Sequence, residues 1–234
     1  MDSSPAADQT TALLILARLW PTLTDEQMRI LSENMVVRNY EKHETIYLEG
    51  EEPSQMFLLL DGKVKIYKEG VGGRTQIVRM PKPLGFFGYR AGFAGDTYST
   101  SAAAFEPSTL CVIATSAVKA VMRGNFEVGV YFLNQLARLL RHADEQTVNL
   151  TQKHIRGRLA EGLLRLQEHY GKDSATGVLN IQLSREDLAS LSNMTTSNAI
   201  RTLSAFANER LIAVDGRRIT IIDEQQLLRI SKMG

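Results

Sequence analysis

The stretch SREDLASLSNMTTSNAIRTLSAFANERLIAVDGRRITII, residues 184–222, carries the most specific pattern in the chain. Ser184 and Asp187 are spaced as a capping box, in which each side chain satisfies a free backbone N–H at the start of a helix. Asn193 follows where a short helix must turn, and asparagine tolerates left-handed backbone better than most residues. The sequence therefore predicts a short helix followed by a tight turn.

A second helix is predicted after the turn, with Thr195 as its N-cap. Its apolar residues recur at helical spacing and form one stripe: Ala199, Leu203 and Phe206. The opposite face is mostly small and polar: Thr196, Ser197, Ile200, Arg201 and Ser204. Two helices joined in this way are a helix-turn-helix, and the second helix has the size and chemistry to enter a DNA major groove.

Two β-rich runs follow, joined at Asp215-Gly216, a dipeptide typical of a two-residue hairpin turn. A basic pair, Arg217 and Arg218, comes directly after it, and a basic hairpin beside a helix-turn-helix indicates a winged helix. Helix-turn-helix shapes also occur in α-rich proteins that do not bind DNA. The capped first helix, the outward arginine and the basic hairpin together favour DNA binding. The side chains expected at the DNA are Thr196, Ser197, Arg201, Arg217 and Arg218.

The whole chain has the composition of a globular protein of one or two domains, with 234 residues, 44% hydrophobic and 23% charged. Its strongest apolar run, residues 12–17, is far too short to span a bilayer, and the N-terminus lacks the basic region of a signal peptide. The single cysteine, Cys111, excludes an intramolecular disulfide and a cysteine-held iron–sulfur cluster within one chain. These features predict a cytoplasmic protein without a membrane partner.

The net charge of +1 hides a mild asymmetry along the chain. Residues 153–234 carry 12 Lys and Arg against 9 Asp and Glu, and the preceding residues carry 15 against 17. The sign of this difference suits a C-terminal half that approaches phosphates.

The N-terminal half begins with a helical segment, residues 11–34, and changes between 36 and 115 to about eight short strands at regular spacing. Asp61-Gly62 is a hairpin signal, and the four residues after it alternate with period two. Short strands with Gly-rich turns are typical of a jelly roll or a small barrel, whose interior can hold one small ligand. We therefore expect an α+β chain with an N-terminal β jelly-roll barrel.

A long helix is predicted from about residue 116 to residue 152. Residues at spacings of four and three form an a/d seam over nearly three heptads: Phe132, Leu136, Leu139, Ala143, Gln146 and Leu150, widened by Leu133 and Leu140. This helix could simply pack on its own barrel, but the chain offers no second long helix to pair with it, so we predict a homodimer. The domain boundary is expected after residue 152, which leaves residues 153–234 as the DNA-binding domain. There, residues 153–170 should form a helix and residues 179–183 a strand.

The order of small barrel, long dimerisation helix and winged helix-turn-helix resembles the CRP/FNR family of bacterial transcription regulators over essentially the whole chain. The IYLEGE…FLLLDGKVKIY pattern, the Gly85-Phe86-Phe87-Gly88 turn and the stretch from residue 183 carry this resemblance. It implies a homodimer that binds a small effector in the barrel, a palindromic double-stranded operator through paired recognition helices, and RNA polymerase. It also implies that Ser184, Thr195 and Arg217 contact the DNA backbone.

The effector region departs from the family pattern. Relatives that bind cyclic AMP use a Glu in the Gly-x-x-Gly turn and an Arg-Ser pair, but here the Glu position is Phe86 and the Arg-Ser region is Asp96-Thr97-Tyr98-Ser99. A cyclic phosphate without a cationic partner loses its best hydrogen bonds, and only Arg74, Arg79 or Arg90 could replace that partner. We therefore expect a small effector other than cyclic AMP. The candidate effector contacts are Phe86, Gly88, Tyr98 and Ser99.

The sequence of the recognition helix also differs from the family pattern. Family members often carry Arg-Glu-x-x-x-Arg or Glu-x-x-Ser-Arg, whereas this chain has Thr196-Ser197-x-x-x-Arg201. Only the last arginine is kept, so the operator should share at most part of the usual consensus.

Other chemistry finds little support in the sequence. The four histidines, His43, His142, His154 and His169, are scattered, and none lies at a metal-binding spacing. A haem needs only one or two axial ligands and stays compatible with the sequence, so the cofactor is left open. We expect no enzyme, because neither a phosphate-binding Gly-Lys loop nor a readable catalytic constellation is present. The alternative function is a sensory module whose C-terminal domain binds protein instead of DNA.

Overall fold

The computed structural model describes residues 8–233, which form two compact units. The first unit takes in the chain up to Lys68 together with Val78–Leu140, and the second takes in Glu69–Ile77 together with the chain from Arg141 onward. The division between the units therefore falls inside the long helix, ahead of residue 152.

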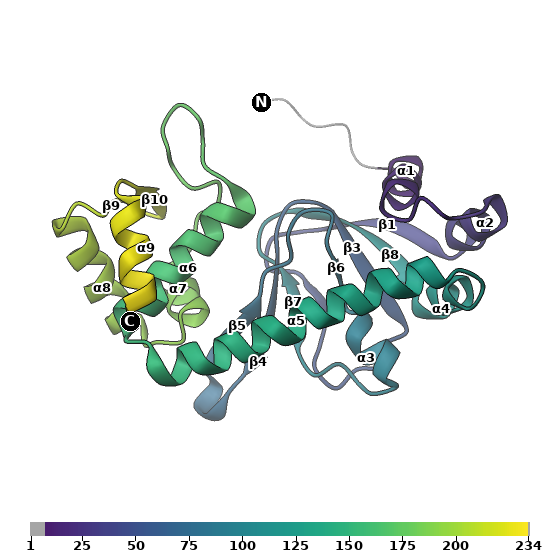
Figure 1. The fold of residues 1–234 in the computed structure, drawn as a ribbon, viewed down its shortest axis with the longest axis horizontal. Helices are drawn as coiled ribbons and strands as arrows, with labels where there is room; N and C mark the ends of the chain where they lie inside the picture. The colour runs from purple at the N-terminus through teal and green to yellow at the C-terminus, as the bar shows by residue number, and fades with distance from the viewer. Residues whose placement is uncertain (1–7, 234) are drawn as a thin grey trace. The chain divides into compact units, whose positions relative to one another are not determined.

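Two four-stranded sheets form most of the first unit and are drawn from purple through blue to teal in Figure 1. Residues 69 and 75–77 of their strands belong to the second unit. One sheet has the order β1 (Met35–Tyr40), β8 (Ser108–Ala114), β3 (Gln55–Asp61) and β6 (Phe86–Phe87). The other has the order β2 (Thr45–Tyr47), β7 (Ser101–Ala104), β4 (Val64–Glu69) and β5 (Thr75–Arg79). All eight predicted strands are present, and the pairs made by β8, by β3 and by β7 are antiparallel.

Strand β3 is buried on both of its faces. Phe57 and Leu59 belong to the core between the sheets, whereas Met56 and Leu58 belong to a second core on the other side. Successive side chains of a strand point to opposite faces, so a strand covered on both sides needs apolar residues at every position. This burial explains the continuous run MFLLL, and β8 with its run TLCVIA follows the same rule.

Helices supply the second core of the first unit. They are α1 (Gln9–Leu19), α2 (Asp25–Glu33), α3 (Tyr89–Ala94), α4 (Thr115–Gly124) and the first half of α5 (Phe126–Gln152). The predicted helix from 116 to 152 is interrupted at Asn125, whose backbone is extended and whose Nδ2 donates to the Thr22 carbonyl at 2.9 Å. Helix α3 was not predicted from the sequence.

The second unit contains the predicted helix-turn-helix and hairpin. Its elements are η1 (Val71–Gly73), α6 (Ile155–Tyr170), α7 (Arg185–Leu191), α8 (Thr196–Asn208), β9 (Ile212–Asp215), β10 (Arg218–Ile221) and α9 (Glu224–Met233). The strand predicted at residues 179–183 is reduced to isolated bridges, in which Leu179 pairs with Lys172 and Val178 pairs with Thr220. No helix within residues 8–233 combines the length and the apolar character needed to cross a membrane.

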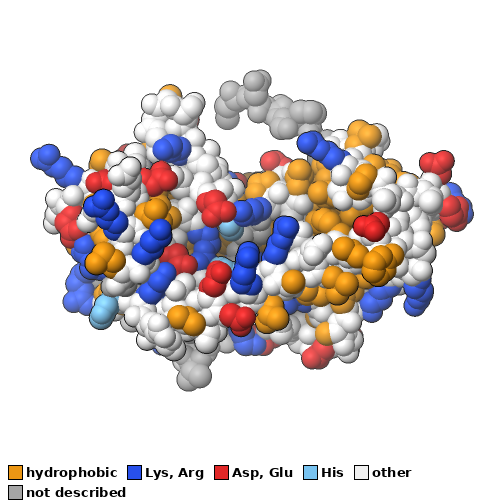
Figure 2. Space-filling view, viewed as in Figure 1, with side chains coloured by type: hydrophobic (Ala, Val, Ile, Leu, Met, Phe, Trp, Pro, Cys, Tyr) orange, Lys and Arg blue, Asp and Glu red, His pale blue; other side chains and the backbone are white. Residues whose placement is uncertain are grey.

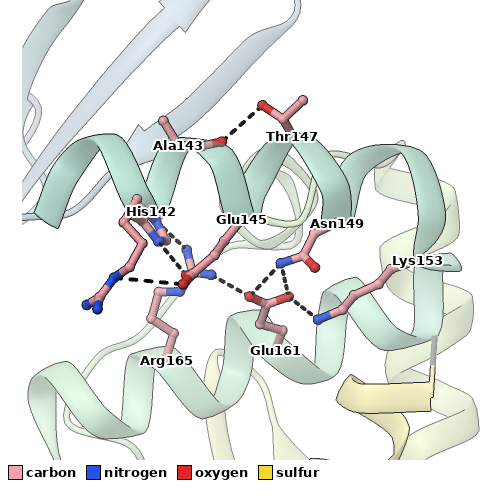
Figure 3. A network of polar contacts seen from close by, with 9 residues as sticks. His142, Ala143, Glu145, Thr147, Asn149, Lys153, Glu161 and Arg165 are labelled. Carbon is pink, nitrogen blue, oxygen red and sulfur yellow. Dashed lines mark hydrogen bonds and ion pairs between the residues drawn. The ribbon is translucent and has the colours of Figure 1, made fainter. Parts of the chain in front are cut away.

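A polar network fixes the end of α5 to α6 inside the second unit (Figure 3). The carboxylate of Glu161 accepts from Asn149 Nδ2 at 3.0 Å, from Lys153 Nζ at 2.9 Å and from Arg165 Nη2 at 2.8 Å. The other terminal nitrogen of Arg165 lies 3.2 Å from Nε2 of His142 on α5. These side chains are only partly exposed, so their charge-assisted hydrogen bonds are screened less than those of a surface pair.

Candidate nucleic-acid interface

Helix α7 begins with the predicted capping box. The backbone N–H of Asp187 donates to Ser184 Oγ at 3.0 Å, and that of Ser184 donates to Asp187 Oδ2 at 3.3 Å. The turn after α7 passes through Asn193, which has a φ of 49° as its residue type suggested. The Met194 N–H then donates to the Ala189 carbonyl at 3.0 Å, which closes the turn. The path from α7 to α8 is therefore set by local hydrogen bonds.

Helix α8 is held by its predicted apolar stripe. Thr195 caps the helix and accepts from Asn198 N at 3.3 Å, and the buried residues are Ala199, Thr202, Leu203 and Phe206. Arg156 of α6 lies over the Phe206 ring at 4.9 Å and makes two hydrogen bonds to Glu209, at 2.7 and 2.8 Å. These bonds lower the pKa of Glu209.

The exposed face of α8 carries the predicted DNA contacts. Ser197 and Arg201 are exposed on it, and Thr196 is partly exposed at its start. The Nη2 group of Arg201 donates to Asn198 Oδ1 at 2.6 Å, one turn earlier on the helix. This contact restrains the guanidinium and leaves its other donors free. Asn198 and Ile200, which is 46% exposed, also lie on this face although neither was predicted as a DNA contact.

The wing forms as predicted, with a one-residue change in the turn. Asp215 pairs with Arg218, so Gly216 and Arg217 are the central residues of the turn. Gly216 has a φ of 57°, a conformation that glycine adopts without strain. Arg217 is thus at the tip, while Arg218 is the first residue of β10, and both are exposed. Within residues 8–233, neither makes an ion pair, and both cations can therefore meet a phosphate.

The four candidate effector contacts do not converge. Phe86 stacks on Trp20 at 5.1 Å in the core under the helices, whereas Tyr98 stacks on Tyr47 at 4.0 Å in the core between the sheets. Gly88 lies next to Phe57, where a Cβ atom would meet the ring at 2.8 Å, and Ser99 is exposed. Phe86 and Tyr98 therefore line no common pocket in this structure, because they belong to two different cores on opposite sides of a sheet.

Arg79 is the cation that the structure places deepest among the three arginines considered for the effector. It ends β5 and is only partly exposed, and its guanidinium makes no hydrogen bond or ion pair to residues 8–233. Burial lowers the pKa of Arg79, while the nearby hydroxyls of Tyr89 and Tyr47 act in the opposite direction. Arg74 and Arg90 are exposed.

The residues of the predicted seam on α5 differ in their exposure in the single chain. Phe132 is 1% exposed and packs within its own unit against Trp20, Tyr89 and Phe93, so it has no surface for a partner. Leu136 and Leu139 are partly buried and pack against that core. The exposed stripe instead follows Phe126, Leu133 and Leu140, seven residues apart and 76%, 61% and 65% exposed. Hydrophobic side chains gather on this side of the first unit in Figure 2. Ala143 and Leu150, further along α5, are exposed in the single chain.

The described residues were also considered as metal ligands and as a reactive thiol. Within residues 8–233, no three His, Cys, Asp or Glu side chains come together as metal ligands would. Cys111 is buried beside Met35, and burial raises the pKa of its thiol to about 12. A thiol that stays protonated is a poor nucleophile.

Comparison with known proteins covers both units. Residues 37–125 match a cyclic nucleotide-binding domain, and residues 157–230 match a Crp-like helix-turn-helix domain. A CRP-like cAMP-activated global transcriptional regulator of Mycobacterium tuberculosis is 23% identical over 93% of this chain and 97% of its own length.

Solved structures show the same fold. FixK2 from Bradyrhizobium japonicum gives a TM-score of 0.76 at 24% identity, covering 84% of this chain and 96% of its own. The c-di-GMP responsive regulator CLP of Xanthomonas campestris gives 0.73 at 16% identity, covering 85% and 99%. A β-roll domain, a long helix and a Crp-like helix-turn-helix in this order make the chain a member of the CRP/FNR family of transcription regulators.

Proposed function

We propose that the protein binds a palindromic operator in the cytoplasm as a homodimer, with α8 of each chain in a major groove and each wing on the adjacent backbone. The observation that carries this proposal is the exposed face of α8, where Arg201 is pre-positioned by Asn198 in the same unit as the unpaired wing arginines. Arginine bonds guanine O6 and N7 bidentately, and wing arginines suit phosphate. Ser184, Thr195, Thr196 and Ser197 would add hydroxyl or backbone contacts to the DNA.

The homodimer is supported by the stripe of Phe126, Leu133 and Leu140, which lies at heptad spacing on the outer side of α5. Large apolar side chains in such a row lose exposed surface when two helices pack together. The two α8 helices, one from each chain, would then each bind one half-site, and the two half-sites would lie about one helical turn of DNA apart. RNA polymerase is the partner that a promoter-bound regulator of this family would contact.

The effector is proposed to be a small molecule other than cyclic AMP. The Glu and Arg that would hold the ribose and the cyclic phosphate are absent, and the rings of Tyr47, Phe57, Phe87 and Tyr98 fill the space between the sheets. Haem remains compatible with the chain, whereas an iron–sulfur cluster is not expected with a single cysteine.

Salt dependence of DNA binding tests the proposed function. The affinity of the full chain for random-sequence duplex should fall linearly on a log–log plot as salt rises, because each neutralised phosphate releases counterions. Replacing Arg217 and Arg218 by Ala should lower that slope by about two. A double Arg38→Ala, Arg123→Ala variant removes the same charge from exposed sites of the first unit and should leave the slope unchanged. No measurable DNA binding would instead favour the protein-binding sensory module.

A further inference from the structure

The exposed face of α8 presents only two long side chains at its centre. Ile200 and Arg201 are adjacent, and the residues one turn away on either side, Ser197 and Ser204, are exposed and short. Ile200 and Arg201 therefore extend furthest from the helix. A binding partner that contacts this face of α8 therefore contacts these two side chains first.

Ile200 has no packing role that accounts for its position. The buried stripe of α8 is complete without it, since Ala199, Leu203 and Phe206 are at most 2% exposed, whereas Ile200 is 46% exposed. Single exposed apolar residues are common on proteins and need no explanation on a free surface. Ile200, however, lies beside Arg201 on the face proposed to enter DNA, where contact excludes water.

The edges of the base pairs limit what an isoleucine can contact there. Almost every group in the major groove is a hydrogen-bond donor or acceptor, and the C5-methyl of thymine is the apolar exception. An aliphatic side chain over a polar edge would desolvate that edge without replacing its hydrogen bond, which is unfavourable. A thymine methyl avoids this cost and gains from burial.

We infer that Ile200 contacts the C5-methyl of a thymine next to the base pair contacted by Arg201, and so determines one position of each half-site. This inference rests on the proposed function and extends it. Burial of one methyl group corresponds to about a fourfold change in Kd, and about 15-fold when both half-sites change together.

Removal of that methyl from the DNA tests the inference. A duplex enriched by the full chain from a random-sequence library supplies the operator, and each thymine is replaced in turn, in both half-sites, by deoxyuridine. This replacement removes the methyl and keeps every hydrogen-bonding group. We expect wild-type binding to weaken by about 15-fold at one thymine per half-site. The remaining thymines serve as internal controls.

The matching protein variant is Ile200→Ala. Because Ile200 is half-exposed, this change should leave the circular dichroism spectrum intact, and the variant should bind the thymine and deoxyuridine operators within about twofold of each other. Ser204→Ala, a change at an exposed neighbour, should keep the full penalty. A deoxyuridine penalty that persists in Ile200→Ala, or one absent from the wild type, would overturn the inference. If no sequence is enriched, the proposed function fails, and this inference fails with it.

Discussion

The side chain of Arg201 is oriented by Asn198, whose side-chain oxygen accepts a hydrogen bond from the Nη2 group of Arg201. Held in this way, the guanidinium can present its remaining donors to one guanine. Arg201→Ala should cost about 1–3 kcal/mol of operator binding and relax the preference at one base pair per half-site. Affinities for the operator and for every single-base-pair variant of it would measure both effects.

Ser204→Ala is the matched control, because Ser204 is exposed one turn further along the helix. This variant should keep the preference at the base pair assigned to Arg201. An equal loss of affinity for all sequences in Arg201→Ala would mean that Arg201 contacts only phosphate.

Single residues were predictable from the sequence where their role is local. The capping by Ser184 and the positive φ of Asn193 follow from side-chain chemistry within a few positions of the chain. Phe86 was not predictable in this way, because its surroundings depend on which face of β6 is covered by helices distant in sequence. Its family position suggested a ligand contact, whereas Trp20, Tyr131 and Phe132 surround it.

Helix α5 also shows that a sequence pattern alone does not reveal which face of an element the rest of the protein buries. Its sequence is apolar on two adjacent faces, so periodicity alone supported a seam through Phe132 and Leu139 as well as one through Leu133 and Leu140. Only the packing of the first unit separates them, because it buries Phe132 completely. Residues 179–183 are a similar case, since their side chains are buried alternately although only Leu179 makes a β-bridge and no strand forms.

Replacing Leu133 and Leu140 by Asp should convert the dimer to monomers, because the charges would be buried without partners against the second chain. Both positions are exposed in the single chain, so its own core should persist. Sedimentation velocity would measure the mass, and gel shift the accompanying loss of operator binding. An Asn134→Asp, Arg141→Asp variant alters neighbouring exposed positions and should stay dimeric. A Leu133, Leu140 variant that remains dimeric would place the interface elsewhere.

Glu161→Gln should loosen the junction of α5 and α6. The carboxylate accepts from Asn149, Lys153 and Arg165, and the amide would leave two cations without their anion, at a cost of about 1–3 kcal/mol. Hydrogen exchange should then accelerate in α6 and in the last turns of α5. Glu33→Gln, a change to an exposed side chain 3.2 Å from Arg29 in the first unit, is the control and should leave exchange in α5 and α6 unchanged. Equal exchange rates in both variants would show that the network adds no local stability.

At the scale of the whole molecule, the fold is shared with relatives named for different signals, cAMP for one and c-di-GMP for another. The fold therefore does not identify the effector, which has to be inferred from the residues of this chain. Millimolar cyclic AMP or cyclic GMP should leave the melting temperature unchanged. A ligand at 100 times its Kd would add about 2.7 kcal/mol and raise the melting temperature by roughly 2–4 °C.

A saturable shift with either nucleotide would contradict the absence of a phosphate site. If the Arg79→Ala variant abolished that shift, the phosphate would be held by the partly buried arginine at the end of β5. Arg74→Ala and Arg90→Ala, at exposed arginines, would be the matched controls.

The most direct test of the account is the symmetry of the DNA that the full chain selects from a random-sequence duplex library. Two chains with paired α8 helices should enrich a palindrome whose half-sites lie about 10 base pairs apart, each with the guanine assigned to Arg201. Enriched sequences without dyad symmetry would contradict the homodimer, and the absence of any enriched sequence would contradict sequence-specific DNA binding itself.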